Sequence, residues 1–283
     1  MIELHESFYP SVAGFLPALQ LDTVIAYSIV EKRQKGRIFV DNKTNPPSVL
    51  IWHCYGAAVL TGNCNNVEFN HGIKNLLFRR HEDNQQRITI SIDSAAWQRK
   101  IEDMLNGHLL VYAELEKRQA DITELGKSHV IVHRRLRHKL NIDRFKAAAG
   151  NITTPGKFIL RKINKEIYPK ITGRVVPGSF WASAEAFLKT GAGYCLMDGD
   201  KFACVSFSAY IGNGQIDVGI ETNPEYRRRG LGAPTAAAMV GYCLDHGYQP
   251  VWGCLQDNVG SALIAKQVGF DIVGSHPVFV SLE

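Results

Sequence analysis

A short arginine- and glycine-rich segment, Asn223–Gly232, constrains the fold of this chain of 283 residues more than any other feature. It follows an alternating apolar run over Gln215–Thr222, which predicts a strand, and precedes a helix expected over Gly232–His246. Glycine lets a backbone approach an anion closely, and the first N–H groups of a helix are free to bond that anion. The three consecutive arginines, 227–229, add positive charge. We call this segment the cradle and expect it to bind an anion, in particular a pyrophosphate.

The residues after the cradle extend the pattern. Pro234 falls in the first turn of the expected helix, where its missing N–H has no consequence, and Gly247 is placed to cap the helix end. A short apolar strand is expected over Pro250–Leu255. The residues from Asn258 to Phe270 then predict a loop, a helix and a turn into a last strand.

Taken in order, these features resemble the GNAT N-acetyltransferase superfamily, whose members bind acetyl-CoA. The resemblance covers roughly Phe180–Val280 and rests on Pro224-x-x-Arg227-x-x-Gly230-x-Gly232, Asn258 and Gly269-Phe270. A narrower resemblance, to a bacterial subfamily with a divergent N-terminal region, rests on further short motifs. These are Phe180-Trp181, Gly193-Tyr194-Cys195, Ser206-x-Ser208, Glu221-Thr222, Tyr242-Cys243 and Pro250-x-Trp252.

The resemblance implies acetyl-CoA as co-substrate, with its pyrophosphate on the cradle. Asn258 is expected against the pantetheine arm, although it could serve only as a helix cap, and Ser261 could cap the same helix or contact CoA. The residues expected to hold CoA are Thr222, Asn223, Arg227, Arg228, Arg229, Gly230, Leu231, Gly232, Asn258 and Ser261. No spacing of histidines typical of a zinc site is present, so we expect no metal.

The implied reaction is direct attack of a neutral amine on the thioester carbonyl. Backbone N–H groups near Glu221–Asn223 would stabilise the oxyanion, and a base would take the proton of the amine. Glu221 and Asp217 are the candidate bases, because strand alternation places both on one face with Gly219 between them. The missing side chain of Gly219 could leave room for substrate. The alternative is that both acids are solvated strand carboxylates.

One position departs from the family. GNAT enzymes commonly carry a tyrosine seven residues after the asparagine, as the acid for the CoA thiolate, and this chain has Ala265 there. A thiolate can leave unaided, because the pKa of a free thiol is about 8.5. Alternatively, Cys254, Ser208 or Tyr210 could replace the tyrosine in space. The departure also leaves open a CoA-binding regulatory protein without catalysis.

The expected fold class is mixed α/β (α+β), with a GNAT catalytic domain over residues 157–283 and a small α/β domain over residues 1–146. Similar GNAT proteins often carry a degenerate acetyltransferase-like N-terminal half, and because no cradle occurs here we expect no CoA binding in it. A linker is expected over Ala147–Gly156, which is rich in small residues, glycine and proline. In the first domain we expect strands over Ser48–Leu60 (one or two), Arg87–Ile92, Leu109–Glu114 and His129–His133, and a helix from Asp93 or Ser94 to Leu105.

Composition excludes several classes. Hydrophobic residues make up 45% and charged residues 21%, as in globular proteins, and no apolar run is long enough to span a membrane. The six cysteines lack a Cys-x-x-Cys spacing and predict reduced, buried thiols. The start of the chain lacks the pattern of a signal peptide. We therefore expect a cytoplasmic protein whose partner is a small-molecule or protein amine and that has no membrane partner.

The basic segment Lys127–Lys146 holds seven lysines or arginines and one acid, Asp143. It could contact nucleic acid, but no aromatic stacking pattern accompanies the charges. We interpret the segment as a solvated basic face or an inter-domain segment, and do not expect a nucleic acid partner.

Overall fold

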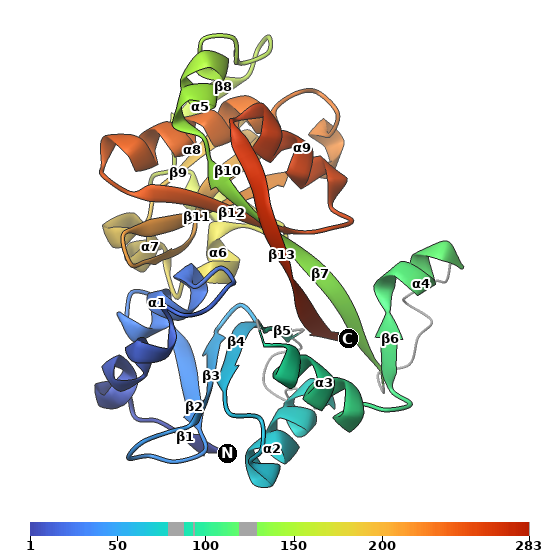
Figure 1. Cartoon of the computed structure of the whole chain (residues 1–283). Helices are drawn as coiled ribbons and strands as arrows, with labels where there is room; N and C mark the ends of the chain where they lie inside the picture. Colours follow the sequence, from blue (N-terminus) through green and yellow to red (C-terminus); the bar gives the residue numbers. More distant parts are fainter. Residues whose placement is uncertain (79–87, 93, 119–128, 283) are drawn as a thin grey trace. The chain divides into compact units, whose positions relative to one another are not determined.

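The computed structural model describes residues 1–78, 88–92, 94–118 and 129–282, which form two compact units of mixed α/β structure (Figure 1). Unit 1 comprises Met1–Lys32, Gly36–Arg135 and Ser275–Glu283, and unit 2 comprises Arg33–Lys35 and Leu136–Gly274. Two strands, β7 (Val130–Leu140) and β13 (Phe270–Ser281), contribute to both units. The predicted fold class is confirmed.

Unit 1 is a sheet with helices on both faces. Its strand order is β1-β2-β3-β4-β5-β13, and β6 pairs with β7. The pairs are antiparallel from β1 to β4 and between β5 and β13, whereas β4–β5 and β6–β7 are parallel. The elements are β1 (Ile2–Glu3), a 3-10 helix (Glu6–Phe15), α1 (Val24–Val30), β2 (Gly36–Val40), β3 (Ser48–His53), β4 (Ala57–Gly62), α2 (Val67–Phe78), β5 (Thr89–Ser91), α3 (Ala95–Met104), β6 (Leu109–Val111) and α4 (Tyr112–Lys117).

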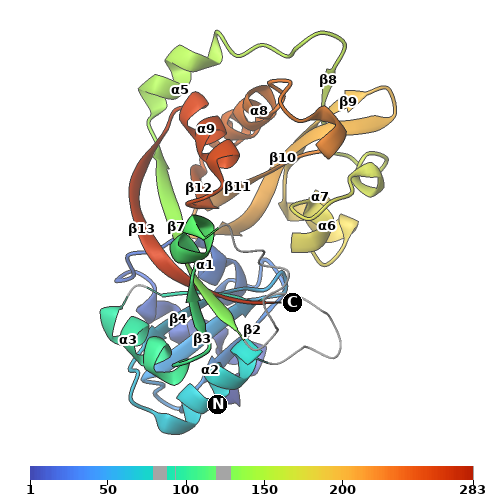
Figure 2. The ribbon, with the colours of Figure 1, turned by 90° about the vertical axis from the view of Figure 1, so that its right-hand side faces the viewer.

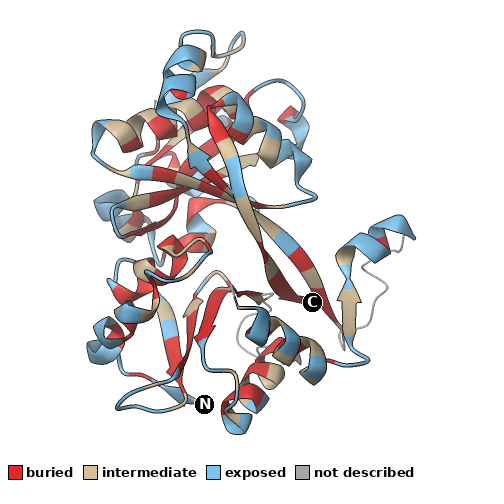
Figure 3. Cartoon of the chain, in the orientation of Figure 1, coloured by how far each residue is buried: buried red, intermediate tan, exposed pale blue. Residues whose placement is uncertain are grey.

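Strand alternation sorts the apolar residues of unit 1 into two cores. On β3, Val49 and Ile51 face the core shared with the first 3-10 helix and α1, and Leu50 faces the core shared with α2 and α3. All three side chains are fully buried, and Figure 3 colours the chain by burial. Because successive residues serve opposite faces, β3 is apolar along almost its whole length, as a strand covered on both faces must be.

Unit 2 holds the predicted catalytic elements. Its strand order is β7-β12-β11-β10-β9-β8, in which β8 to β11 are antiparallel and β11–β12 is parallel. The helices α8 and α9 cover one face, and α6 and α7 cover the other (Figures 1 and 2). The elements are α5 (Ile142–Ala149), β8 (Ile159–Lys162), a 3-10 helix (Tyr168–Lys170), α6 (Pro177–Phe180), α7 (Ala184–Thr190), β9 (Gly193–Asp198), β10 (Lys201–Gly212), β11 (Gln215–Thr222), a 3-10 helix (Pro224–Tyr226), α8 (Gly232–Asp245), β12 (Gln249–Leu255) and α9 (Val259–Gln267).

The elements around the cradle are as the sequence predicts. β11 covers Gln215–Thr222, and α8 ends at Asp245 with Gly247 at φ +73°. The turn into β11 places Asn213 and Gly214 at φ 50° and 69°, the left-handed pair that a two-residue hairpin needs. These local signals are strong because each depends on a conformation that few residue types adopt.

Two strands expected in the first half of the chain have other bounds in the structure. The strand expected over His129–His133 begins at Val130 and continues to Leu140. The strand expected over Leu109–Glu114 ends at Val111, and α4 begins at Tyr112. The wrong part, Tyr112–Glu114, begins the sequence Tyr-Ala-Glu-Leu-Glu-Lys, in which Ala, Leu, Glu and Lys favour helix. The two strands of Ser48–Leu60 and the helix capped by Ser94 are confirmed. Arg87, Asp93 and Lys127 lie outside the described residues.

The chain passes from unit 1 to unit 2 within strand β7, between Arg135 and Leu136. The predicted linker Ala147–Gly156 instead lies inside unit 2, where it ends α5 and leads toward β8. The division therefore differs from the predicted domains 1–146 and 157–283. The amino-acid composition gives no signal of this boundary, because it lies within a continuous strand and not in a linker.

Candidate cofactor and active site

The site begins where two parallel strands separate. β11 and β12 pair only at their starts, through Gln215–Gln249, Ile216–Pro250 and Asp217–Val251. β11 continues to Thr222 and β12 to Leu255 without pairing further with each other, and the structure describes every residue of this stretch. We call this gap in the pairing between the two strands the opening, and backbone polar groups line its edges.

The hydrogen bonds of β11 decide which amides face this opening. The N–H of Asn223 donates to the Ala203 carbonyl on β10, at 3.0 Å. Because successive N–H groups of a strand point to opposite edges, the N–H of Thr222 points away from β10, toward the opening. Of the amides expected to stabilise an oxyanion, that of Asn223 is thus engaged with β10, whereas that of Thr222 faces the opening.

The cradle turn depends on two left-handed residues. Arg228 has φ 60° and Gly230 has φ 74°. The turn is held by Tyr226, a buried residue whose hydroxyl donates to Asp198 Oδ2 at 3.2 Å. A hydrogen bond from Lys157 and this bond from Tyr226 help to lower the pKa of Asp198, which therefore stays ionised. The anchor fixes the turn ahead of α8 while the arginines remain exposed.

The N-terminus of α8 is open toward a ligand. Its N-cap residue, Leu231, makes no side-chain cap bond, and the first amides of a helix have no partner within it. A Cβ added at Gly230 would meet nothing within 4 Å, so the backbone is accessible there. Gly232 differs, because a Cβ there would lie 2.9 Å from Ile264 Cγ1 on α9. Gly230 thus fits the predicted role of close approach to an anion, whereas Gly232 serves helix packing.

Two of the three cradle arginines contact neighbouring residues of the site. Arg227 Nε donates to the Thr222 carbonyl at 3.4 Å, and its Nη2 lies 3.7 Å from Glu221 Oε1. The guanidinium of Arg229 lies over the ring of Tyr226 at 5.2 Å. Arg227 therefore connects the cradle with one of the two candidate bases.

The two candidate bases have different surroundings. The Glu221 side chain is 18% exposed, and the backbone at Gly173 lies beside it, since a Cβ there would come within 3.6 Å of its Cγ. Asp217 is only 3% exposed, so it is not a solvated strand carboxylate. The idea that Gly219 leaves room for substrate is wrong, because the ring of Phe207 fills that space and would lie 2.9 Å from an added Cβ.

The residues of α9 have structural partners. Asn258 Oδ1 accepts the N–H of Ser261 at 3.1 Å and caps the helix. The Ser261 hydroxyl in turn accepts the indole N–H of Trp252 at 3.0 Å. Contact of either residue with CoA stays a prediction. Ala265 is fully buried in α9, at the position where the family tyrosine is expected.

Of the groups that could replace that tyrosine, Ser208 is committed elsewhere. Its Oγ accepts the N–H of Ala192 at 3.0 Å and donates to the Ala192 carbonyl at 3.1 Å. It is fully buried and pairs with Val218, in the middle of β11 and four residues before Thr222. Cys254 lies on β12 beyond the last paired residue, Val251, and is therefore at the opening.

Unit 1 repeats the order of elements but closes the equivalent opening. β4 and β5 are also parallel, and all three residues of the short β5 pair with β4, from Ala57–Thr89 to Val59–Ser91, among the residues that the structure describes. The N-terminus of α2 is closed by Asn66, whose Oδ1 accepts the N–H of Phe69 at 2.9 Å. The indole N–H of Trp97 donates to the Gly62 carbonyl at the end of β4, at 2.9 Å, and the ring is fully buried.

Trp97 and Ser261 occupy corresponding places, each three residues after the cap of the helix that follows the parallel strand. Unit 1 therefore has a tryptophan where unit 2 has a small side chain. Sequence reasoning missed this correspondence, although the cap-to-Trp spacing of Ser94 and Trp97 was available as a signal.

Three other features bear on function: metal sites, reactive thiols and membrane-spanning helices. In the described parts of the chain, no three His, Cys, Asp or Glu side chains gather as a metal site would require. Burial raises the pKa of Cys195 and of Cys243 to about 12, so both thiols stay protonated at neutral pH. Helices in the described residues include none that is long and apolar enough to cross a membrane.

A parallel strand pair that opens beside a basic turn and an uncapped helix is the arrangement expected of a GNAT acyltransferase. The sequence profile described as GNAT acetyltransferase matches residues 18–279, and the chain belongs to this family of acetyltransferases. The Bacillus subtilis (strain 168) protein "Uncharacterized N-acetyltransferase YdfB" is 23% identical over 281 residues, covering 99% of this chain and 98% of that protein.

Two solved structures share the fold. A GCN5-related N-acetyltransferase-like protein from Streptococcus suis 89/1591 superposes with a TM-score of 0.72 at 17% identity, covering 98% of this chain and all of that one. A tandem GNAT protein from the clavulanic acid biosynthesis pathway gives a TM-score of 0.54 at 11% identity, covering 99% of this chain and 97% of that one. At these identities, the likeness concerns the fold alone.

Proposed function

We propose that the protein transfers the acetyl group of acetyl-CoA to an amine, by direct attack of the amine on the thioester. The observation that carries this proposal is the open N-terminus of α8 beside the separated strands β11 and β12. GNAT enzymes in general use acetyl-CoA, and this arrangement offers N–H donors for a pyrophosphate and a gap for the extended pantetheine arm. The acceptor would be a small-molecule or protein amine.

The Thr222 amide is our candidate for the oxyanion donor. A preorganised N–H aimed at the developing negative charge lowers the barrier without reorganisation during the reaction. Thr222 qualifies because its N–H points to the opening, and its carbonyl is already held by Arg227 Nε at 3.4 Å. CoA, when bound, supplies the activated acyl group. The chain supplies position and charge.

Glu221 is our candidate base, with Asp217 in reserve. The Glu221 carboxylate is partly exposed at the end of β11 and can exchange a proton with solvent or substrate, directly or through water. Asp217 is buried four residues earlier, at the position where the pairing with β12 ends. This difference in exposure favours Glu221.

Kinetics of Glu221→Gln would test the base. Loss of a general base lowers the rate by roughly 10²–10⁴-fold, so kcat should fall by that factor while CoA affinity stays within a factor of about two. Asp217→Asn serves as the comparison. A Glu221→Gln variant with full activity and an inactive, folded Asp217→Asn variant would exchange the two roles. Full activity of both variants would refute the assignment of either acid.

No tyrosine is present to protonate the departing CoA thiolate at the position common in the family, because Ala265 stands there. We propose that the CoA thiolate leaves without a dedicated acid or takes its proton from the Cys254 thiol at the opening. Cys254→Ala separates the two routes: unchanged kcat excludes the thiol as an acid, and a fall in kcat that is largest at low pH supports it, because a thiol can donate a proton only while it is protonated.

The alternative function is a CoA-binding regulatory protein without catalysis, which the Ala265 departure favours. Release of free thiol from acetyl-CoA, measured with a panel of primary amines, distinguishes the two. Amine-dependent thiol release supports the enzyme. Saturable CoA binding without release from any amine would support the regulatory protein.

The cradle arginines can be tested independently of turnover. The double change Arg227→Ala, Arg228→Ala should weaken CoA binding by about 1.5–3 kcal/mol for each charged hydrogen bond lost. Two exposed arginines of unit 1, Arg99 and Arg118, provide a control with the same loss of charge. If the control pair weakened CoA binding equally, the effect would be long-range charge, and the cradle would not be the site.

A further inference from the structure

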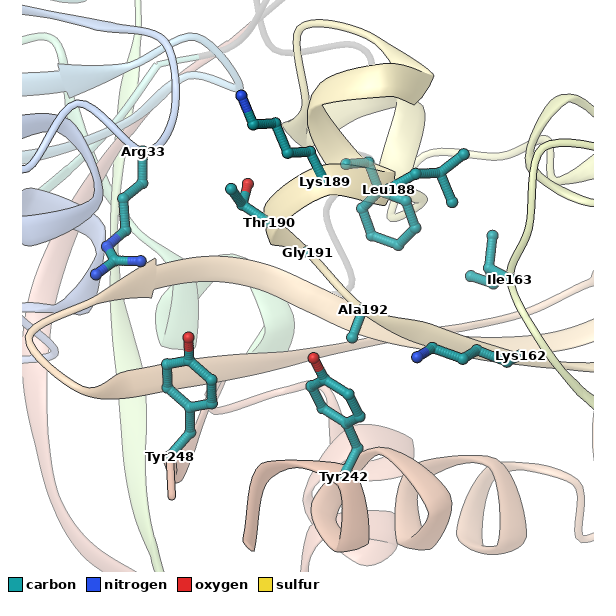
Figure 4. A pocket seen from close by; sticks show the side chains of 11 residues that line it. Arg33, Lys162, Ile163, Leu188, Lys189, Thr190, Gly191, Ala192, Tyr242 and Tyr248 are labelled. Atoms are coloured by element: carbon teal, nitrogen blue, oxygen red, sulfur yellow. The ribbon is translucent and has the colours of Figure 1, made fainter. Parts of the chain in front are cut away.

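Unit 2 contains a cavity of about 320 Å³ whose lining residues include none of the cradle (Figure 4). It lies beside the end of α7, the end of β8 and the last turns of α8. The lining residues are Arg33, Lys162, Ile163, Phe187, Leu188, Lys189, Thr190, Gly191, Ala192, Tyr242 and Tyr248. Tyr242 is ten residues after Gly232 on α8, so roughly 15 Å along the helix axis separates this cavity from the start of that helix.

The charge of the lining is one-sided. It contains three cationic side chains, Arg33, Lys162 and Lys189, and no acid. The Lys162 ammonium lies over the ring of Tyr242 at 5.2 Å. Within the described residues, neither lysine forms an ion pair with a carboxylate. An anion bound beside these cations would gain favourable electrostatic energy.

Arg33 is carried into unit 2 by its neighbour. The side chain of Gln34 is buried, and its Nε2 donates to the carbonyls of Phe180 and Ala209 at 3.3 and 2.8 Å. Its Oε1 accepts the N–H of Ile211 at 3.3 Å. These three bonds fix the backbone beside Arg33 to β10 and α6, so the guanidinium is presented to the cavity from an anchored position.

Hydroxyl groups complete the lining. Thr190 Oγ1 donates to the Ala186 carbonyl at 3.1 Å, so its proton is used within α7. The hydroxyls of Tyr242 and Tyr248 make no hydrogen bond to another described residue and can donate to a ligand. Figure 4 shows the side chains of Arg33 and Tyr248 pointing toward one another. The lining therefore offers donors from at least two places in the chain, the guanidinium of Arg33 and the two tyrosine hydroxyls.

The surroundings of Tyr242 limit the shape of the ligand. One ring contact is with Lys162, and His246 stacks on the ring with centroids 3.9 Å apart and an interplanar angle of 26°. An aromatic ligand therefore cannot stack freely on Tyr242. Recognition must come from charge and hydrogen bonds, which suits a small aliphatic anion.

We propose that this cavity binds a small aliphatic dianion, a phosphate monoester or a dicarboxylate, at a site separate from the cofactor cradle. Arg33, Lys162 and Lys189 would contact the anionic oxygens, and the Tyr242 and Tyr248 hydroxyls would donate the remaining hydrogen bonds. The proposal does not depend on the proposed acetyl transfer.

Lysine labelling of the full chain tests the location. The protein is reductively methylated with and without glycerol 3-phosphate or succinate, and the extent of labelling at each lysine is read by mass spectrometry. Lys162 and Lys189 should be protected in a saturable manner by at least one of the two anions, and Lys201, exposed on β10, should be labelled equally throughout. Protection by one anion alone identifies the class. No protection by either, or equal protection of Lys201, would overturn the proposal.

Calorimetry with the protective anion tests the contacts. The double change Lys162→Met, Lys189→Met should weaken binding by roughly tenfold or more, which corresponds to about 1.4 kcal/mol. Lys201→Met removes a similar exposed charge and should leave the affinity within about twofold, since exposed charges beyond a Debye length are screened. Tyr242→Phe, which retains the ring under Lys162, should weaken binding by a smaller factor. Equal losses in the double variant and in Lys201→Met would show non-specific attraction and refute the site.

Discussion

Gly230 should be indispensable for CoA binding and dispensable for folding. The residue has φ 74°, which L residues rarely adopt, and a Cβ there would meet no atom of the protein within 4 Å. Gly230→Val should therefore destabilise the fold only through backbone strain, about 1–2 kcal/mol. In the complex, the same side chain would stand where the phosphates approach the backbone.

Gly247 provides a matched control at the other end of α8. It has φ 73° and no atom within 4 Å of an added Cβ, so Gly247→Val imposes the same strain without entering the cradle. Both variants should lose a similar free energy of unfolding, with the melting temperature falling by roughly 2–4 °C for each kcal/mol. A difference between them in CoA affinity is then a property of the site and not of the fold.

The affinity loss can be bounded. A backbone N–H bonded to a phosphate contributes about 1.5–3 kcal/mol, so losing two such bonds in Gly230→Val should raise the Kd at least one-hundredfold. Calorimetric titration with CoA of the native chain, Gly230→Val and Gly247→Val measures this directly. Native affinity in a folded Gly230→Val variant, or an equal loss in Gly247→Val, would refute the assignment of the cradle.

Three further changes test the structure. Gly232→Ala should destabilise unit 2 by about 1–3 kcal/mol through the clash with Ile264, and Ile264→Val should recover part of that loss in urea unfolding. Trp97→Ala should cost about 3–5 kcal/mol of unfolding free energy in unit 1, whereas Trp97→Phe, which loses mainly the bond to the Gly62 carbonyl, should cost about 1–3. Burial lowers the pKa of His53 to about 3, so between pH about 3 and 6.5 the unfolded state binds a proton at this residue and the folded state does not. Below pH about 6.5 the His53 contribution should therefore fall by about 1.4 kcal/mol per pH unit, and His53→Gln should flatten this part of the stability profile.

The elements next to the cradle could be predicted because each has a residue with a restricted conformation. Pro234 in the first turn and Gly247 at the end delimit α8, and the Asn213-Gly214 turn delimits β11. The strand expected over Leu109–Glu114 had no such residue to mark its end, which lies at Val111. Short apolar runs without a conformational marker are compatible with either structure, and tertiary contacts decide between them.

The chemistry of the site was predictable in its residue types and less so in its geometry. The identities of Glu221 and Asp217 were visible, but only the structure separates a partly exposed carboxylate from a buried one. The role of Gly219 could not be deduced, because the ring that fills its space comes from Phe207 on the neighbouring strand. Gly232 likewise faces Ile264, 32 positions later in the chain. Such contacts depend on register between strands and helices, which a single sequence does not reveal.

The pairing of β13 with β5 has a consequence for biosynthesis. Val278, Phe279 and Val280 pair with Ser91, Ile90 and Thr89, and Phe279 is fully buried in the core beneath α2 and α3. A ribosome must therefore synthesise Leu136–Gly274, which belong to unit 2, before the first unit can receive its last strand. Until then, β5 presents unsatisfied amides and carbonyls along one edge, a surface that chaperones and neighbouring nascent chains can bind. A truncation that stops before Ser275 should retain every cradle residue and yet aggregate, because the strand it removes belongs to the other unit.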